Sequence, residues 1–204
     1  MTAVPENHSP NAEAPNAQAP TAEDLAAVAE QLGREPRGVL EISYRCPDGA
    51  PGVIKTAPRL PDGTPFPTLY YLTDPRLTAE ASRLEVAHVM KWMTARLESD
   101  ESLARDYREA HEHFLATRNA IEDLGTTFSG GGMPDRVKCL HVLIAYALAE
   151  GPKRVRLGTE AVALAAENPA LRGTAIPADW PTPSDLGIPT AEEINAQVEQ
   201  EMLS

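Results

Sequence analysis

The chain has 204 residues, of which 42% are hydrophobic, and 18 basic against 30 acidic side chains give a formal net charge of −12. This composition fits one folded domain with a packed core, and the acidic charge argues against nucleic-acid binding, because phosphate contacts need a basic face. There is neither an apolar run of about 18 residues, as a membrane helix needs, nor a basic N-terminal region followed by an apolar stretch. The two cysteines are too few for a disulfide framework. We therefore expect a cytoplasmic protein that contacts neither nucleic acid nor membrane.

The two ends of the chain differ in composition from its middle. Residues 1–21 carry a proline at every fifth position among Ala, Asn and Glu, which predicts a disordered tail. Residues 173–204 contain six acidic residues, four prolines and no Lys or Arg, which predicts a second, acidic tail. Within it, Thr190 and Glu193 have the spacing of a capping box, so a short helix is expected there. A single domain is predicted over residues 22–172.

The first half of this domain predicts a short helix and then strands. A helix is expected over residues 22–33, with Thr21 as its N-cap and a glycine as its end. Apolar and polar residues then alternate over 40–45, which indicates a half-buried strand, and residues 53–56 and 68–72 predict two more. Frequent prolines and Asp-Gly turns keep these strands short and favour an antiparallel meander.

The second half predicts helices. Apolar spacing indicates helices over residues 77–98, 100–123, 134–150 and 159–168, the third of them starting at Pro134 and ending at Gly151. The predicted fold class is therefore α+β: a small antiparallel meander packed with four to five helices, with a disordered tail at each end.

A glycine-rich stretch before the third of these helices is the first candidate site. Gly130, Gly131 and Gly132 let the backbone approach a ligand closely, and a helix that starts at Pro134 would present free N–H groups to an anion. Asp135 and Arg136 follow, and Arg136 could hold a phosphate or carboxylate. The alternative is a surface loop in which Asp135 itself stabilises the helix dipole.

One face of the preceding helix adds polar residues to this candidate. Tyr107, His111, Phe114 and Arg118 lie within about 60° of one another on a helical projection. If the two helices pack antiparallel, Arg118 and Arg136 would surround one point, and His111 would be the candidate for proton transfer in catalysis. The alternative is a core histidine with its hydrogen bonds satisfied, and Arg118 paired with an acid such as Asp135.

A metal site is the second candidate. Cys46, Asp74 and Cys139 could converge on zinc or iron, although structural zinc usually has four Cys or His ligands. Cys139 and His141 would point about 200° apart on a regular helix and could not share an ion. The alternative roles are simpler: Asp74 caps a helix before Pro75, and both thiols are small buried apolar groups.

Three segments together resemble a known bacterial family. They are Arg45-Cys46-Pro47, the run from Asp62 to Thr73, and the run from Gly132 to His141. They resemble the family filed as domain of unknown function 501, over roughly residues 30–165. The resemblance implies no established activity. Relatives often carry Cys or His where this chain has Asp74, and His where it has Tyr146.

Three functions follow as hypotheses. The first is binding of a small anionic ligand, phosphorylated by preference, between Gly130–Arg136 and the His111/Arg118 face. The second is a non-enzymatic adaptor whose acidic C-terminal helix, with Ile194, Val198 and Met202 on one face, docks into a protein partner. The third is a Cys/Asp-ligated metal-binding domain. Whether the protein is an enzyme stays open.

Overall fold

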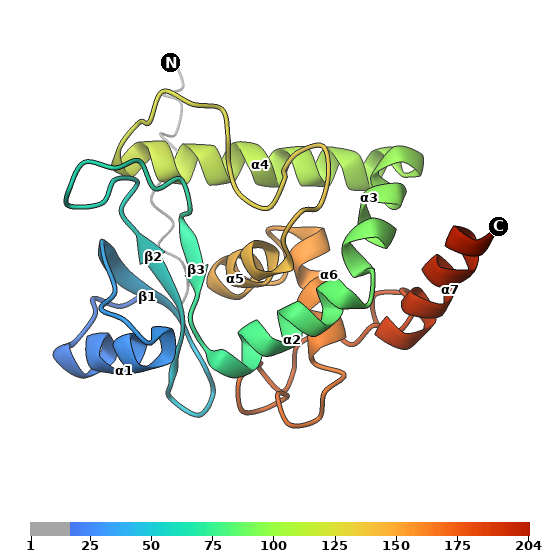
Figure 1. Ribbon diagram of the computed structural model, residues 1–204, viewed down its shortest axis with the longest axis horizontal. Coiled ribbons are helices and arrows are strands. Elements are labelled where there is room, and N and C mark those ends of the chain that lie inside the picture. Colours follow the sequence, from blue (N-terminus) through green and yellow to red (C-terminus); the bar gives the residue numbers. More distant parts are fainter. Residues whose placement is uncertain (1–16) are drawn as a thin grey trace, which may run out of the picture.

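The computed structural model describes residues 17–204 and confirms the α+β fold, with seven helices and one three-stranded sheet in this part of the chain (Figure 1). Residues 1–16, which make up most of the predicted N-terminal tail, lie outside the described residues. None of the described helices is long and apolar enough to cross a membrane.

The sheet is the predicted antiparallel meander. Its strands are β1 (Val39–Arg45), β2 (Pro51–Thr56) and β3 (Tyr70–Leu72), in the order β1-β2-β3. Ile42 pairs with Ile54 across the first ladder, and Val53 pairs with Leu72 across the second. As a result β3 is an edge strand.

Each face of the sheet buries a different set of side chains, because successive residues of a strand point to opposite faces. One face packs Ile42 and Ile54 against Val28 of α1 (Ala22–Leu32). The other face packs Val53, Tyr70 and other residues of the main core against α5 (Leu140–Glu150). In Figure 1, α5 lies in the middle of the molecule. Eight of its eleven residues are buried, as expected for a helix that is apolar all round.

The N-terminus of α1 is fixed by a capping box that also carries an ion pair. Thr21 is the predicted N-cap, and Asp24 accepts hydrogen bonds from the Thr21 N–H at 3.1 Å and from the Arg45 Nη1 at 2.9 Å. The bond with Arg45, followed by those with Thr21, lowers the pKa of Asp24 from 3.8 to about 2, against the opposing effect of burial.

This lowered pKa predicts a loss of stability in acid. The folded-state pKa lies below the unfolded value, so the stabilisation is complete above about pH 4 and is lost as the pH falls towards 2. We expect Asp24→Asn to lower the free energy of unfolding by about 1–2 kcal/mol at pH 7 and by much less near pH 2. Urea unfolding at both pH values checks this, with the exposed neighbour Glu23→Gln as control. A deficit in Asp24→Asn that is the same at both pH values would contradict the assignment.

One predicted helix is in fact two. The expected helix over 77–98 divides into α2 (Pro75–Val86) and α3 (Val89–Ser99), because His88 takes the left-handed conformation with φ of 61°. The break turns the chain so that Leu84 of α2 and Met93 of α3 both reach the core. The apolar spacing is similar on the two sides of the break, which is why the pattern predicted one helix.

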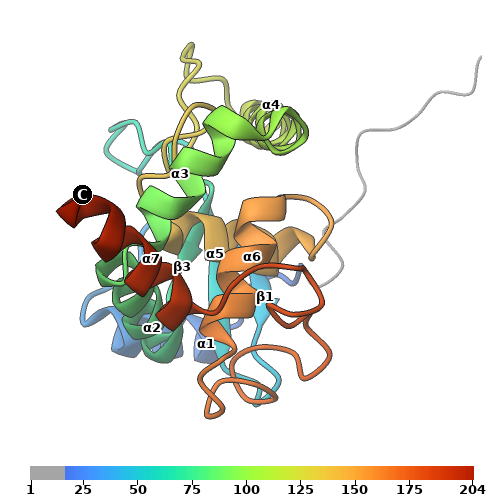
Figure 2. The same ribbon diagram turned by 90° about the vertical axis from the view of Figure 1, so that its right-hand side faces the viewer.

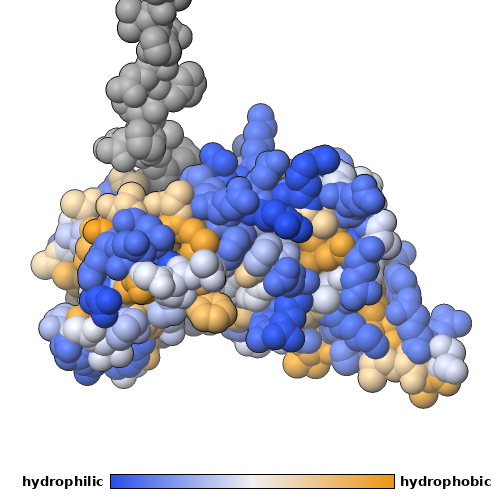
Figure 3. Space-filling view, turned by 90° about the horizontal axis from the view of Figure 1, so that it is seen from above, coloured by the Kyte–Doolittle hydropathy of each residue, from blue (hydrophilic) through white to orange (hydrophobic). Residues whose placement is uncertain are grey.

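The next helices largely follow the prediction. The long α4 (Glu101–Ile121) begins at Asp100, whose carboxylate caps it by accepting from the Leu103 N–H at 3.0 Å. It crosses the top of the molecule in Figure 1, and the face seen from above in Figure 3 is largely hydrophilic with smaller hydrophobic areas. The helix α6 (Arg156–Ala165) begins and ends three residues before the expected range.

The segment before α5 differs from the prediction. Pro134 does not start a helix, since α5 begins at Leu140. Residues 130–138 instead form a compact loop, in which the Lys138 N–H donates to the Gly131 carbonyl at 2.6 Å. A Cβ atom on Gly132, which has φ of 92°, would lie 2.6 Å from the Arg136 carbonyl oxygen. The glycines therefore allow the loop to fold tightly on itself.

The C-terminal segment is ordered, which corrects the predicted disordered tail. Trp180 is buried and its Nε1–H donates to the Thr159 carbonyl at 3.2 Å. The predicted short helix is present as α7 (Ala191–Leu203), with the Thr190 and Glu193 capping box. Figure 2 shows α7 beside α3, and these two helices are in contact. Ile194 and Val198 of the face expected to dock a partner are buried by the chain itself, whereas Met202, the third residue of that face, is exposed.

Candidate functional site

Arg118, a predicted anion ligand, holds a loop instead. Its side chain is fully buried, and its guanidinium donates to the carbonyls of Thr126, at 2.9 Å, and Phe128. It also donates to the Asn119 Oδ1 at 3.0 Å, and it forms no ion pair with any residue from 17 onwards, so the alternative pairing with Asp135 is also wrong. The hydrogen bonds of the Arg118 side chain are thus made to neighbouring protein groups.

The other predicted anion ligands do not converge on Arg118. Tyr107 donates to the backbone carbonyl of Arg136 at 3.3 Å, and Arg118 lies three turns, or roughly 16 Å, further along α4. The side chains of Asp135 and Arg136 are exposed. Because no helix begins at Pro134, its expected free N–H groups are also absent. The prediction of one positively polarised pocket is therefore wrong.

The glycines of the predicted anion loop contact protein atoms. A Cβ on Gly130 would lie 2.7 Å from the Val142 side chain, and one on Gly131 would lie 3.4 Å from the Cys139 carbonyl oxygen. This part of the loop is packed against the start of α5.

His111, the predicted catalytic residue, contacts Ser129, which directly precedes the three glycines. It is partly buried, and its Nδ1 lies 2.8 Å from the Ser129 Oγ. Burial lowers its pKa. His113 is also partly buried, and its Nδ1 lies 2.8 Å from the Tyr146 hydroxyl. Neither histidine joins a group of potential metal ligands among the described residues.

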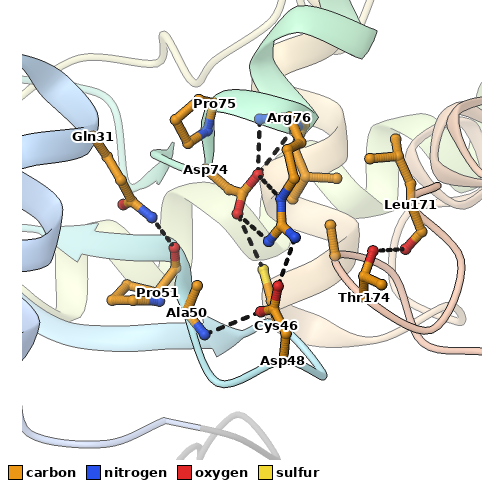
Figure 4. Close-up of polar contacts among 12 residues, drawn as sticks. Gln31, Cys46, Asp48, Ala50, Pro51, Asp74, Pro75, Arg76, Leu171 and Thr174 are labelled. Carbon is orange, nitrogen blue, oxygen red and sulfur yellow. Dashed lines mark hydrogen bonds and ion pairs between the residues drawn. The ribbon is translucent and has the colours of Figure 1, made fainter.

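Two of the predicted metal ligands, Cys46 and Asp74, are buried and belong to one network of polar contacts (Figure 4). The Asp74 carboxylate caps α2 through the backbone N–H groups of Arg76 and Leu77, and it receives the Arg76 guanidinium at 2.7 Å. The Cys46 Sγ lies 3.6 Å from the Asp74 Oδ2, and Arg76 also reaches Asp48 at 2.5 Å. Asp74 thus has the simpler role of a helix cap.

Cys46 is held as a neutral thiol. Burial, followed by the neighbouring Asp74 carboxylate, raises the pKa of Cys46 to about 12. Cys139 is not part of this network, so the predicted trio Cys46, Asp74 and Cys139 does not form one site.

Cys139 belongs to a different group, in which it meets His141 and Glu85. In the described part of the chain, these three are the only Cys, His, Asp and Glu residues whose potential ligand atoms form a group, and all lie within 4.8 Å of one another. Cys139 is the N-cap of α5 and has extended backbone, with φ of −156° and ψ of 116°. Because Cys139 is outside the helix, the expected separation of about 200° from His141 does not apply.

Glu85 comes from the last turn of α2 and is fixed by α5. Its Oε1 accepts a hydrogen bond from the Leu140 N–H at 2.8 Å and lies 3.1 Å from the His141 Nδ1. Contacts with Cys139 and then with Glu85 raise the pKa of His141 to about 9, against the opposing effect of burial.

Ser82 orients the imidazole of His141. The Ser82 hydroxyl donates to the Thr78 carbonyl at 3.0 Å, so its oxygen is free to accept from the His141 Nε2, which lies 3.4 Å away. This arrangement assigns a proton to Nε2 and leaves Nδ1 directed at Glu85.

Cys139 and His141 also line a cavity of about 420 Å³. Its other walls come from the C-terminal end of α1, from Thr78 of α2, and from the strand segment between Thr68 and Thr73. Two of the three candidate ligands therefore lie beside a space that a small molecule could enter.

Sequence reasoning missed Glu85 and separated Cys139 from His141. The error came from starting the helix at Pro134. The run from Leu140 to Ala149, which is apolar apart from His141 and Tyr146, is the signal for the true start, because a helix buried on all sides is apolar on nearly all sides.

The comparisons with known proteins support the family resemblance. The sequence profile described as "Protein of unknown function (DUF501)" matches residues 42–163, a range that includes most of the sheet, the candidate ligands and most of α6. No curated protein and no solved structure matches the chain. Since the match covers more than half of the sequence, the chain belongs to the DUF501 family.

Proposed function

We propose that this protein binds a transition-metal ion, zinc or iron, through Cys139, His141 and Glu85. The observation that carries the proposal is the convergence of a thiol, an imidazole and a carboxylate within 4.8 Å. Zinc takes these three kinds of donor in proteins, and the thiol disfavours magnesium or calcium, which prefer oxygen ligands.

The distances suit direct coordination after a small closure. Tetrahedral zinc with bonds of about 2.0–2.3 Å holds its ligand atoms roughly 3.5 Å apart. The His141 Nδ1 and the Glu85 Oε1 are already 3.1 Å apart. Three protein ligands and one open position are typical of catalytic zinc, whereas structural zinc usually has four protein ligands.

Contacts around the three ligands support the same assignment. Metal-bound histidines generally donate their second N–H to a neighbouring acceptor, and Ser82 is that acceptor for His141. The Leu140 N–H fixes the Glu85 carboxylate in a similar way. Neither contact uses the imidazole Nδ1, which would lose its proton when it binds an ion.

The open position would face the cavity that Cys139 and His141 line. A bound metal there would polarise an oxygen ligand or activate a water molecule. Cys139, His141 and Glu85 would hold the ion, and the cavity walls would select what reaches it. Since both cysteines are free thiols and Cys139 must stay reduced to act as a ligand, we propose a cytoplasmic location.

Elemental analysis of protein purified without a histidine tag tests the proposal. We expect about one zinc or iron ion per wild-type chain and almost none in Cys139→Ser. The matched control is Cys46→Ser, which removes the buried thiol outside the site and should retain the ion. Wild-type protein that takes up no zinc or iron even after reconstitution would contradict the proposal. Equal metal content in the wild type and Cys139→Ser would contradict it as well.

A further inference from the structure

Among residues 17–204, Phe128 is the only Phe, Tyr or Trp whose side chain is exposed, with 77% of its surface open to solvent. It lies in the segment between α4 and α5, which side chains of α4 hold in place. The Phe128 carbonyl accepts from the Arg118 guanidinium, and the Oγ of the next residue, Ser129, lies 2.8 Å from the His111 Nδ1. The fold thus fixes the backbone that presents this apolar ring, and a pre-organised aromatic side chain is a typical anchor of protein interfaces.

A cavity of about 390 Å³ on the α1 side of the sheet has room for such a ring, since a cavity of about 150 Å³ already holds benzene. Its apolar walls are Leu32, Ile54, Leu60, Phe66 and Tyr71. All of these except Ile54 are partly exposed, so they can be reached from solvent. Phe66 and Tyr71 form a tilted aromatic pair with ring centroids 6.4 Å apart, and a further ring packs favourably against such a pair.

The charged groups at this cavity balance one another. Arg34, Glu35 and Arg37 line it, and Asp62 lies close enough to Arg37 for their charges to interact. Two positive and two negative groups favour neither a cation nor an anion as occupant. The apolar walls therefore decide what binds, and they favour an uncharged apolar group.

Phe128 and the cavity lie at the same end of the molecule. Arg59, which precedes the cavity residue Leu60, forms an ion pair of 2.7 Å with Glu122, which directly follows α4. Figure 1 accordingly shows the segment between β2 and β3 beside the end of α4, at the upper left. When an anchor and a complementary cavity lie at one end of a molecule, a twofold rotation lets two copies exchange their anchors, and the contact closes after two chains.

We infer that two copies of this chain form a twofold symmetric dimer, in which Phe128 of each copy enters the cavity beside Phe66 of the other. The occupant is a second copy because one chain carries both the exposed ring and the open apolar cavity. Burial of two exposed rings supplies the hydrophobic driving force. None of the three proposed metal ligands lines this cavity, so the dimer goes beyond the proposed function and does not depend on it.

Sedimentation equilibrium of the full chain over a series of protein concentrations tests this inference. We expect a reversible equilibrium between monomer and dimer that a chelator leaves unchanged, which separates this result from the fate of the metal proposal. Loss of each anchor should weaken the dimer about tenfold, so Phe128→Ala should raise the dissociation constant about a hundredfold. The mixed dimer of this variant with the wild type should be weakened about tenfold. The control Val86→Ala changes a residue of α2 that is 78% exposed, and it should leave the dissociation constant within about twofold.

Two variants that each lack the contact should restore part of it when mixed. Leu60→Trp fills the cavity and keeps the ring of Phe128, whereas Phe128→Ala keeps the cavity and lacks the ring. Their mixture can place one ring in one open cavity, so it should associate about tenfold more tightly than either variant alone. Urea unfolding of both variants verifies that they fold like the wild type. A wild-type chain that stays monomeric at every soluble concentration, a dimer that Phe128→Ala leaves intact, or a mixture no tighter than its components would overturn the inference.

Discussion

Replacing Arg118 by Met is expected to lower the free energy of unfolding by about 3 kcal/mol. Methionine replaces the aliphatic stem with an apolar side chain, but it is shorter than arginine and cannot donate to the buried carbonyls of Thr126 and Phe128. A buried acceptor that loses its donor costs roughly 1–3 kcal/mol. Removal of a charge that has no acidic partner offsets part of this cost, because burial of the guanidinium is itself unfavourable.

Urea unfolding measures this loss in the free energy of unfolding, and two further variants serve as comparisons. Arg118→Lys keeps the charge but lacks the planar fork, so an intermediate loss is expected. Arg105→Met changes an exposed arginine of the same helix, and its effect should stay within about 0.5 kcal/mol. If Arg118→Met proved as stable as the wild type, the bonds of the guanidinium to Thr126 and Phe128 would not stabilise the fold.

Zinc is expected to stabilise the fold by a predictable amount. At a free zinc concentration 100 times the dissociation constant, binding to the folded state alone adds about 2.7 kcal/mol to the free energy of unfolding. His141→Ala should abolish this gain, because the imidazole is one of three ligands. The control His111→Ala removes a histidine outside the site and should keep the full gain.

Ser82→Ala provides a graded test of the same linkage. It preserves the three ligands but removes the acceptor for the His141 Nε2–H, a kind of change that typically weakens metal binding 10- to 100-fold. A tenfold loss would reduce the gain at the same zinc concentration to about 1.4 kcal/mol. Chemical unfolding with buffered zinc and with chelator measures both values. Equal stabilisation of the wild type and His141→Ala would show that zinc binds elsewhere.

Local rules predicted the sheet and many helix ends. Alternating residues around Ile42 predict a strand, although as a half-buried one, and Thr21, Asp100 and Thr190 cap helices by short-range hydrogen bonds. These features depend on neighbours in sequence, so a single chain contains enough information to find them.

The structural features that the sequence did not predict depend on long-range contacts. His88 takes a left-handed conformation where α2 and α3 both turn towards the core. Trp180 orders an acidic, proline-rich segment by packing on α6 through a bond to Thr159. Composition alone favours disorder there, because it does not show that one aromatic side chain packs into the core.

The sequence did not predict the candidate metal site because one helix start was placed wrongly. Pro134 is a common first residue of helices, and placing it there put Cys139 and His141 on opposite sides of one helix. The glycines allow residues 130–138 to close into a loop, which moves the helix start to Leu140. Glu85 then meets both side chains across α2 and α5, a contact that no spacing within either helix predicts.

X-ray absorption at the zinc edge on reconstituted, untagged protein tests the proposed ligand set most directly. With one thiolate, one imidazole and one carboxylate, the spectrum should contain a single sulfur at about 2.3 Å and nitrogen or oxygen neighbours at about 2.0–2.1 Å. The sulfur shell should vanish in Cys139→Ser and persist in Cys46→Ser. A wild-type spectrum without sulfur, or one that is unchanged in Cys139→Ser, would contradict the assignment.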